Sequence, residues 1–125
     1  MNSFARELQA SAWDAECKHD LDRLLSHFLP DATFHASGQP AKQGHDAIRE
    51  LTEDFYRSFP ELEVDILGEW DDGRTSAVIE FRARLTDPDG NRFALQGVNI
   101  VEIEDGKFRT VRSYEEAPVP VTGTG

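Results

Sequence analysis

The chain has 125 residues, of which 38% are hydrophobic and 30% are charged, a composition typical of one soluble globular domain. Its formal net charge of -11 repels phosphate groups, so we expect neither nucleic acid nor an anionic membrane surface as a partner. No apolar run approaches the ~20 residues that span a bilayer, and the first residues lack the pattern of a secretory signal. We therefore expect a cytoplasmic protein.

Metal and cofactor chemistry finds little support in the residue pattern. Cys17 is the only cysteine, which excludes an internal disulfide and a thiolate metal cluster, and we expect a partly buried helical thiol there. No two of the four histidines have convincing metal-ligand spacing. The glycines form no phosphate-binding pattern, so the sequence predicts neither a metal nor a cofactor.

Helical periodicity is confined to the first half of the chain. Phe4, Leu8 and Ala12 recur at helical spacing and predict a first helix. A leucine-rich stripe predicts a second helix from Leu21 to Leu29, with Asp20 as its N-cap and Pro30 ending it. A third helix is predicted from about 45 to 58, followed by a proline at position 60.

Alternating patterns predict a short strand at 32–36 and an antiparallel sheet in the second half. The sheet strands are expected at 62–70, 75–86, 92–104 and 107–116, separated by turn sequences such as "DPDG" at 87–90. We expect an α+β fold with one domain over 1–117. Residues 118–125 should form a tail that does not pair normally, because Pro118 and Pro120 lack N–H donors.

The strand at 93–103 is apolar on both faces, whereas a strand at a solvated surface is apolar on one face only. Its two faces hold, respectively, Phe93, Leu95, Val101 and Ile103, and Ala94, Val98 and Ile100. The helices can cover one of these faces. Since no element is left for the other face, we expect a homodimer that packs sheet against sheet.

Three segments in this order resemble the nuclear transport factor 2-like superfamily, especially its SnoaL-like branch. They are "AWDAECKHDLDRLLSHFLPDATFH" (12–35), "GHDAIRELTEDFYRSFPEL" (44–62) and "GVNIVEIEDGKFRTVRSYEE" (97–116). The resemblance covers about 4–117. It implies a cone-shaped half barrel, in which a curved sheet wraps a long helix around a mostly apolar pocket, and most relatives dimerise through the outer face of the sheet.

Two activities of the superfamily do not fit the residues of this chain. Ketosteroid isomerases need a carboxylate base, a tyrosine and a protonated aspartate, and the corresponding positions fall near Ala36, near Ala12 and at Asn99. A methyl group cannot abstract a proton, so this chemistry is rejected. Epoxide hydrolases of the limonene type need two carboxylates and an arginine, but the alternation around Glu80 and Arg82 predicts an outer charge ladder instead.

The cyclase activity of SnoaL-like proteins fits better, since it uses an acidic residue near the end of the last strand and no cofactor. Glu116 takes the matching position, one methylene longer than the usual aspartate, although a β-bulge would turn Glu115 inward instead. His35 is a second candidate for proton transfer, because imidazole titrates near neutral pH. The expected ligand-binding residues are Asn99, Tyr114, Trp13 and Phe59.

The sequence thus predicts a protein that binds a hydrophobic small molecule in a pocket. If it is an enzyme, it should perform cofactor-independent acid/base catalysis, of aldol cyclase or isomerase type, on an apolar carbonyl compound such as a polyketide or a steroid-like ring. The alternative is a ligand-binding or dimeric assembly domain without catalysis. A cavity on which Glu116 and His35 converge would distinguish the two.

Overall fold

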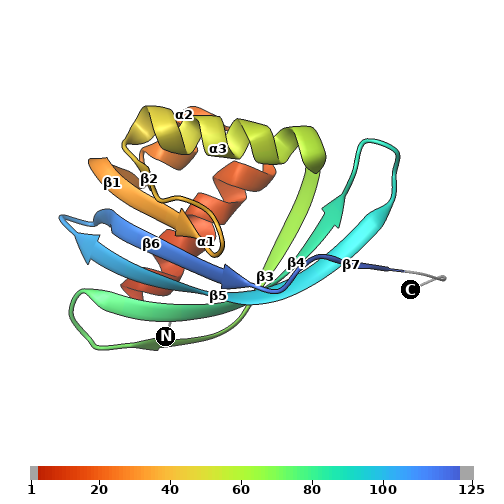
Figure 1. Cartoon of the computed structure of the whole chain (residues 1–125). Helices are drawn as coiled ribbons and strands as arrows, with labels where there is room; N and C mark the ends of the chain where they lie inside the picture. The colour runs from red at the N-terminus through yellow and green to blue at the C-terminus, as the bar shows by residue number, and fades with distance from the viewer. Residues whose placement is uncertain (1–2, 122–125) are drawn as a thin grey trace.

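A curved sheet carries three helices on its concave side in the structure of this protein, a computed structural model that describes residues 3–121 (Figure 1). The helices are α1 (Phe4–Cys17), α2 (Leu21–Leu25) and α3 (His45–Ser58). The strands are β1 (Phe28–Ala36), β2 (Lys42–Gln43), β3 (Glu61–Asp71), β4 (Ser76–Thr86), β5 (Arg92–Glu104), β6 (Lys107–Glu115) and β7 (Val119–Pro120). The predicted α+β class is confirmed.

Local signals in the sequence account for where the helices begin. The Ser3 side chain caps α1 by accepting a hydrogen bond from the Arg6 N–H at 3.1 Å. Asp20 caps α2 in the same way, accepting from the Arg23 N–H at 3.2 Å, as predicted. Gly44, which precedes α3, has a φ of 88°, a conformation that side chains rarely adopt.

The second helix is shorter than the sequence predicted. It ends at Leu25, and Phe28 already belongs to β1, where it packs against Phe108 with ring centroids 5.1 Å apart. Pro30 lies inside β1 rather than ending a helix. Strand β1 tolerates it because the register with β6 shifts between Phe28 and Thr33, so the missing N–H falls where the ladder is interrupted.

The sheet order β2-β1-β6-β5-β4-β3 places the last long strand beside the first one. The pairs β3–β4, β4–β5 and β5–β6, which follow one another along the chain, are antiparallel, as the tight turns predicted. β1 and β6 are parallel, with Ala36 opposite Ser113, so both strands end at the same edge of the fold. This arrangement brings residues near position 36 next to residues near position 115.

The predicted unpaired tail is partly wrong. Val119 and Pro120 form β7, which pairs antiparallel with Ala94 and Phe93 of β5. The N–H of Val121 donates to the Arg92 carbonyl at 2.9 Å. Backbone N–H groups alternate in direction along a strand, so those of odd-numbered residues face β5, and the two proline nitrogens face away. Residues 122–125 of the predicted tail lie outside the described residues.

The core lies between the concave face of the sheet and the helices. The core divides into two clusters. The larger one lies between the helices and strands β1, β4, β5 and β6, and the smaller one surrounds Phe81 and Leu95. The buried face of α1 agrees only in part with the predicted stripe. Ala12 is buried and Leu8 packs against the core, as predicted, but Phe4 is 56% exposed. Ala5, Gln9 and Ala15 are also buried.

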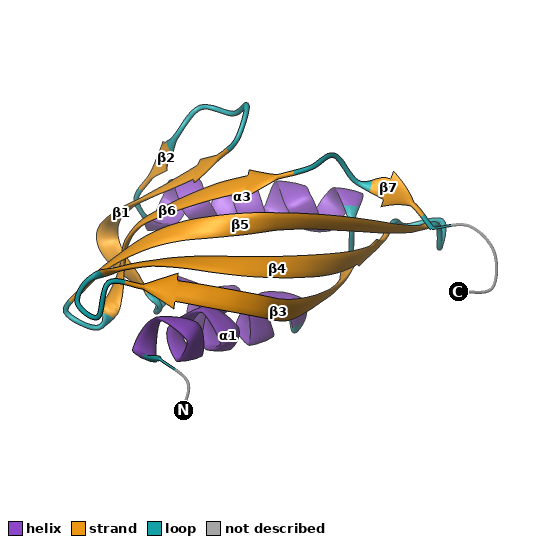
Figure 2. Cartoon of the chain, turned by 90° about the horizontal axis from the view of Figure 1, so that it is seen from below, coloured by secondary structure: helices purple, strands orange, loops and turns teal. Residues whose placement is uncertain are grey.

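Figure 2 shows the convex face of the sheet, with the helices behind it. Trp70 and Tyr114, on strands β3 and β6, are 61% and 43% exposed. Val98 and Ile100 of β5, which the sequence placed on the second apolar face, are only partly buried, while Leu95 and Val101 on the inner face are buried. Within residues 3–121, no helix has both the length and the apolar character needed to cross a membrane.

Candidate functional site

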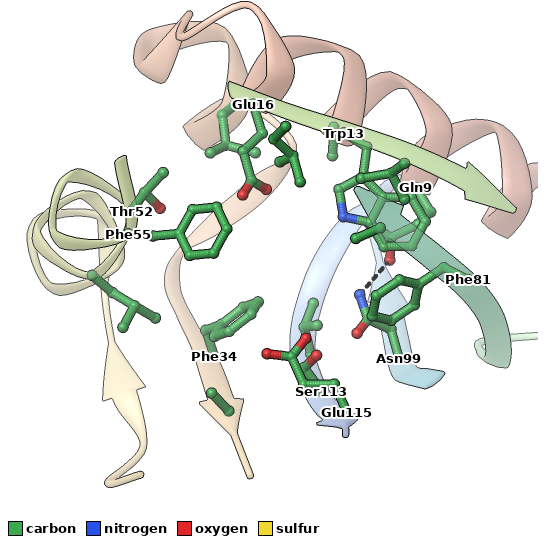
Figure 3. Close-up of a pocket in the computed structure, with 18 of the residues that line it drawn as sticks. Gln9, Trp13, Glu16, Phe34, Thr52, Phe55, Phe81, Asn99, Ser113 and Glu115 are labelled. Atoms are coloured by element: carbon green, nitrogen blue, oxygen red, sulfur yellow. Dashed lines mark hydrogen bonds between the residues drawn. The ribbon is translucent and has the colours of Figure 1, made fainter. Parts of the chain in front are cut away.

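The concave face of the sheet and the helices enclose a cavity of about 170 Å³ (Figure 3). Most of its wall is apolar and includes the rings of Trp13, Phe34, Phe55 and Phe81. An engineered apolar cavity of about 150 Å³ holds a benzene molecule, so this one has room for about one ring. The polar residues on its wall are Gln9, Glu16, Thr52, Asn99, Ser113 and Glu115.

Glu16 reaches the cavity from the last turn of α1. Burial raises the pKa of its carboxyl from 4.5 to about 7, and the negative charge of Glu115 adds to this rise. The C-terminal end of a helix dipole is negative, which disfavours a carboxylate there for the same reason. The Tyr56 hydroxyl fixes this part of α1 by donating to the Glu16 carbonyl oxygen at 2.6 Å.

Glu115 lies across the cavity from Glu16, at the last residue of β6, and both carboxyls point into the cavity in Figure 3. Its side chain is accessible at the mouth, yet the surrounding apolar wall still removes part of its hydration. Burial accordingly raises the pKa of Glu115.

A glycine allows β5 to approach β6 closely at Glu115. Gly97 is the cross-strand neighbour of Glu115. A Cβ atom at position 97 would lie 2.5 Å from the Tyr114 carbonyl oxygen and 2.8 Å from the Glu115 Cβ, which is closer than real Cβ contacts. The absence of a side chain at Gly97 therefore leaves the space that the backbone of Glu115 occupies.

Glu116, the residue that the resemblance selected, is not among the residues that line this cavity. It is exposed, and its backbone N–H donates to the Gln96 carbonyl at 3.0 Å. Its carboxylate accepts from the Gln96 N–H at 3.1 Å. The sequence left open whether Glu115 or Glu116 faces the pocket. In the structure Glu115 faces the cavity, and Glu116 continues the pairing with β5.

Asn99 forms a buried amide pair with Gln9 at the base of the cavity, and both side chains are 4% exposed. The Asn99 Nδ2 donates to the Gln9 Oε1 at 3.1 Å, as the dashed line in Figure 3 shows. The Asn99 Oδ1 is buried and has no hydrogen-bond partner among residues 3–121. An unpaired buried acceptor is costly, so this oxygen is available to a bound molecule.

The remaining sequence candidates divide into two groups. Trp13 lines the cavity, where its ring packs against Phe81 at a centroid distance of 5.0 Å. His35, Tyr114 and Phe59 are absent from the wall. Phe34 and Ala36 face the cavity, so alternation directs His35 to the opposite side of β1.

The other two residues that the sequence selected for the pocket pack elsewhere. Tyr114 lies on the convex face, opposite Val98 in the neighbouring strand. Phe59 packs between Phe55 and Phe93, with ring centroids 5.6 Å from each. Phe59 thus belongs to the smaller core cluster.

Sequence reasoning missed Gln9 and Glu16. They are seven residues apart and share a helical face with Ala12 and Trp13, so the face that meets the sheet carries two polar side chains. Polar residues at core positions of an amphipathic helix are the signal that was available.

The positions that correspond to the isomerase base and tyrosine do lie on the cavity wall. Ala36 and Ala12 both line it and provide only methyl groups. Glu80 and Arg82 are not on the wall. The neighbouring Arg84 forms ion pairs with Glu63 at 2.9 Å and Asp65 at 3.2 Å, in agreement with the predicted outer charge ladder.

A second, wider groove of about 890 Å³ lies at the end of the β3–β4 pair, near Cys17 and Val121. Its charged groups include Glu63 and Arg84, which neutralise each other. Burial raises the pKa of the Cys17 thiol to about 11, so the thiol stays protonated at neutral pH. Within the described chain, no three His, Cys, Asp or Glu side chains gather in a way that would hold a metal ion.

The sequence pattern of the SnoaL-like domain matches residues 6–111. The chain belongs to the SnoaL-like family. No curated protein sequence matches it significantly. The nuclear transport factor 2-like architecture of a SnoaL-like domain is the one seen here, with helices on the concave side of an unclosed, mostly antiparallel sheet.

Several solved structures share the fold of this SnoaL-like chain at low sequence identity. A nuclear transport factor 2-like protein of unknown function from Burkholderia pseudomallei has a TM-score of 0.81 and 18% identity, covering 92% of each chain. A protein assigned as a SnoaL-like polyketide cyclase from Shewanella putrefaciens has a TM-score of 0.80 and 14% identity, covering 92% of this chain and 91% of that one. An epoxide hydrolase of limonene type from Mycobacterium tuberculosis has a TM-score of 0.76 and 18% identity, covering 90% and 83%.

The family and the cavity together support a protein that binds a small molecule. The side chains of Glu16 and Glu115 lie on opposite sides of an apolar cavity (Figure 3). Burial raises the pKa of both carboxyls above that of free glutamate. Two acidic groups whose environments differ are the usual basis for acid/base work at neutral pH.

Proposed function

We propose that this SnoaL-like protein is a cofactor-independent acid/base enzyme, of cyclase or isomerase type, that acts on a small carbonyl compound of about one ring. The single observation that carries the proposal is the pair Glu16 and Glu115, which reach one apolar cavity from two different elements. The cavity volume of about 170 Å³ favours a compact substrate over a multi-ring one, unless part of the substrate extends through the mouth.

The two carboxyls take different roles in this mechanism. Glu115, at the accessible mouth, is the carboxylate base that removes a proton from the carbon next to the substrate carbonyl. The electrons of the broken C–H bond form the enolate, and its oxygen accepts a hydrogen bond or a proton from the protonated carboxyl of Glu16. With a pKa of about 7, Glu16 keeps a large share of its protons at neutral pH, as a general acid requires.

The proposal is tested by proton exchange, which needs no knowledge of the natural substrate. Cyclohexanone and acetophenone would be incubated with the protein in D₂O, and the loss of the α-proton signal would be followed by NMR. We expect exchange well above the buffer rate. Exchange at the buffer rate with both ketones would count against the proposal and favour a binding domain without catalysis.

We also propose that the protein is a homodimer that pairs through the convex face of the sheet. A continuous apolar row crosses three strands, since Trp70 pairs with Val78 and Val78 pairs with Ile100. Val98 and Tyr114 extend this row onto β6. Exposed apolar patches of this kind are typical of protein interfaces, and a second copy supplies a matching surface by symmetry.

Ile100→Glu is expected to convert the dimer into a monomer, because it places a charge in the middle of the apolar row. Light scattering coupled to size-exclusion chromatography would give twice the chain mass for the wild-type protein and the chain mass for the variant. A wild-type protein that elutes as a monomer at high concentration would contradict the proposal.

A further inference from the structure

The cavity contains acidic groups without a basic partner. Glu16 and Glu115 line it, whereas no Lys, Arg or His side chain is on its wall in the described part of the chain. Some carboxylates elsewhere in residues 3–121 do have cationic partners. Asp14, for example, lies 3.2 Å from the Lys18 Nζ and 2.9 Å from an Arg23 guanidinium nitrogen. The apolar wall removes part of the hydration of the Glu16 and Glu115 carboxyls, so a cationic ligand would stabilise their charged forms.

Asn99 provides an independent observation that points in the same direction. Its side chain is 4% exposed, and one N–H of its Nδ2 donates to the Gln9 Oε1 at 3.1 Å. The Oδ1 atom, which lacks a partner within residues 3–121, is an acceptor only. The cavity therefore offers acceptor oxygens from Glu16, Glu115 and Asn99, and a donor group on a ligand would satisfy them.

The apolar part of the wall suits a cation as well. The faces and edges of Trp13, Phe34, Phe55 and Phe81 surround the space between the two carboxyls (Figure 3). Aromatic rings attract an ammonium group more strongly when water is excluded. The volume of about 170 Å³ limits the body of the ligand to about one ring.

From these features we infer that the cavity binds a small organic ammonium ion, with its N–H groups directed to Glu16 and Glu115 and its apolar body against the aromatic wall. The Asn99 Oδ1 is a further acceptor for a donor group on the same ligand. The inference rests on the proposed function only in using the same two carboxyls, and it does not require catalysis.

Isothermal titration calorimetry with three ligands of one size tests the inference at neutral pH. The probes are benzylammonium, benzyl alcohol and benzoate, which differ mainly in the charge of the polar group. We expect benzylammonium to bind the wild-type protein at least about tenfold more tightly than benzyl alcohol, and benzoate to bind most weakly. Equal or tighter binding of benzyl alcohol would overturn the inference, and so would the absence of binding by benzylammonium.

Variants then locate the interaction. Glu16→Gln and Glu115→Gln keep the side-chain shape, and we expect each to reduce the preference for benzylammonium over benzyl alcohol at least about threefold. Glu7→Gln, which removes the same charge from an exposed position on α1, should leave the preference unchanged. An unchanged preference in both cavity variants would overturn the inference. Should a cavity variant not fold, the wild-type ratio still decides.

The ketone exchange assay on the same protein separates this inference from the proposed function. Exchange together with a failure to bind benzylammonium would refute the ammonium site alone. Tight benzylammonium binding without exchange would refute the catalytic proposal alone.

Discussion

Glu115→Gln is expected to slow α-proton exchange of cyclohexanone by about 100-fold or more, because a positioned general base contributes about 10²- to 10⁴-fold to the rate. Glutamine keeps the shape and the polarity of the side chain but cannot take a proton. The Glu16 carboxyl remains in the cavity of this variant, and its position on the opposite wall makes it a poor replacement as the base. The measurement is the exchange rate in D₂O by NMR.

Two matched variants make this result specific. Glu7→Gln changes the net charge equally on an exposed part of α1, and its exchange rate should equal that of the wild-type protein. Glu116→Gln compares the two adjacent candidates at the end of the sheet directly. A larger loss in Glu116→Gln than in Glu115→Gln would show that the residue facing Gln96, rather than the one facing the cavity, performs the proton transfer.

Glu16→Gln is expected to raise the free energy of unfolding at about pH 8 by up to about 3 kcal/mol, and to leave it nearly unchanged at about pH 4. The pKa of Glu16 rises from 4.5 to about 7 on folding, so the folded chain holds a proton that the unfolded chain releases within this range. Stability contributed by this group is therefore full below pH 4.5, falls as the pH rises to about 7, and is constant above that value.

Urea unfolding of the wild-type protein and the variant across this pH range checks the prediction. A glutamine cannot ionise, so the two curves should separate as the pH rises, with the variant more stable. Glu7→Gln, on the solvent side of the same helix, should follow the wild-type curve. Parallel curves for Glu16→Gln and the wild-type protein would show that Glu16 is not perturbed. An ionisable group in a cavity that lowers the stability of the fold is typical of a residue that is kept because the function needs it.

Much of the fold could be predicted from local patterns. The third helix and the four long strands were found within one residue of their observed ends, because their periodicity is strong and their turns contain Gly, Pro and Asp. The predicted end of the second helix was wrong because a local pattern there was misleading. Its leucine-rich stripe continues into Phe28 and Leu29, and only the pairing with β6, a long-range contact, makes these residues a strand.

The end of the last strand shows why the site was harder to predict. Counting alternate residues from the buried Phe108 places Tyr114 and Glu116 on the inner face. The pairing of β5 with β6 shifts register between Glu102 and Ile103, so the inner residues after the shift are Val111, Ser113 and Glu115. A single extra residue reverses every side chain beyond it, and the sequence does not mark where that residue is.

The helix that carries Glu16 presented a different difficulty. Hydrophobic spacing correctly selected Leu8 and Ala12, but Phe4 is exposed, and the rest of the buried face consists mostly of alanines and of the polar residue Gln9. A cavity replaces part of the core there, so the rule that apolar side chains mark the buried face is weakest where the site lies.

The central claim is that Glu16 and Glu115 form an electrostatically coupled carboxyl pair in one apolar cavity, and carbon-13 NMR titration of the glutamate side-chain carboxyls tests it most directly. We expect Glu16 to titrate near a pKa of 7, and its pKa to fall in Glu115→Gln, where the repulsion is removed. A Glu16 pKa near 4.5 that is the same in both proteins would contradict the account.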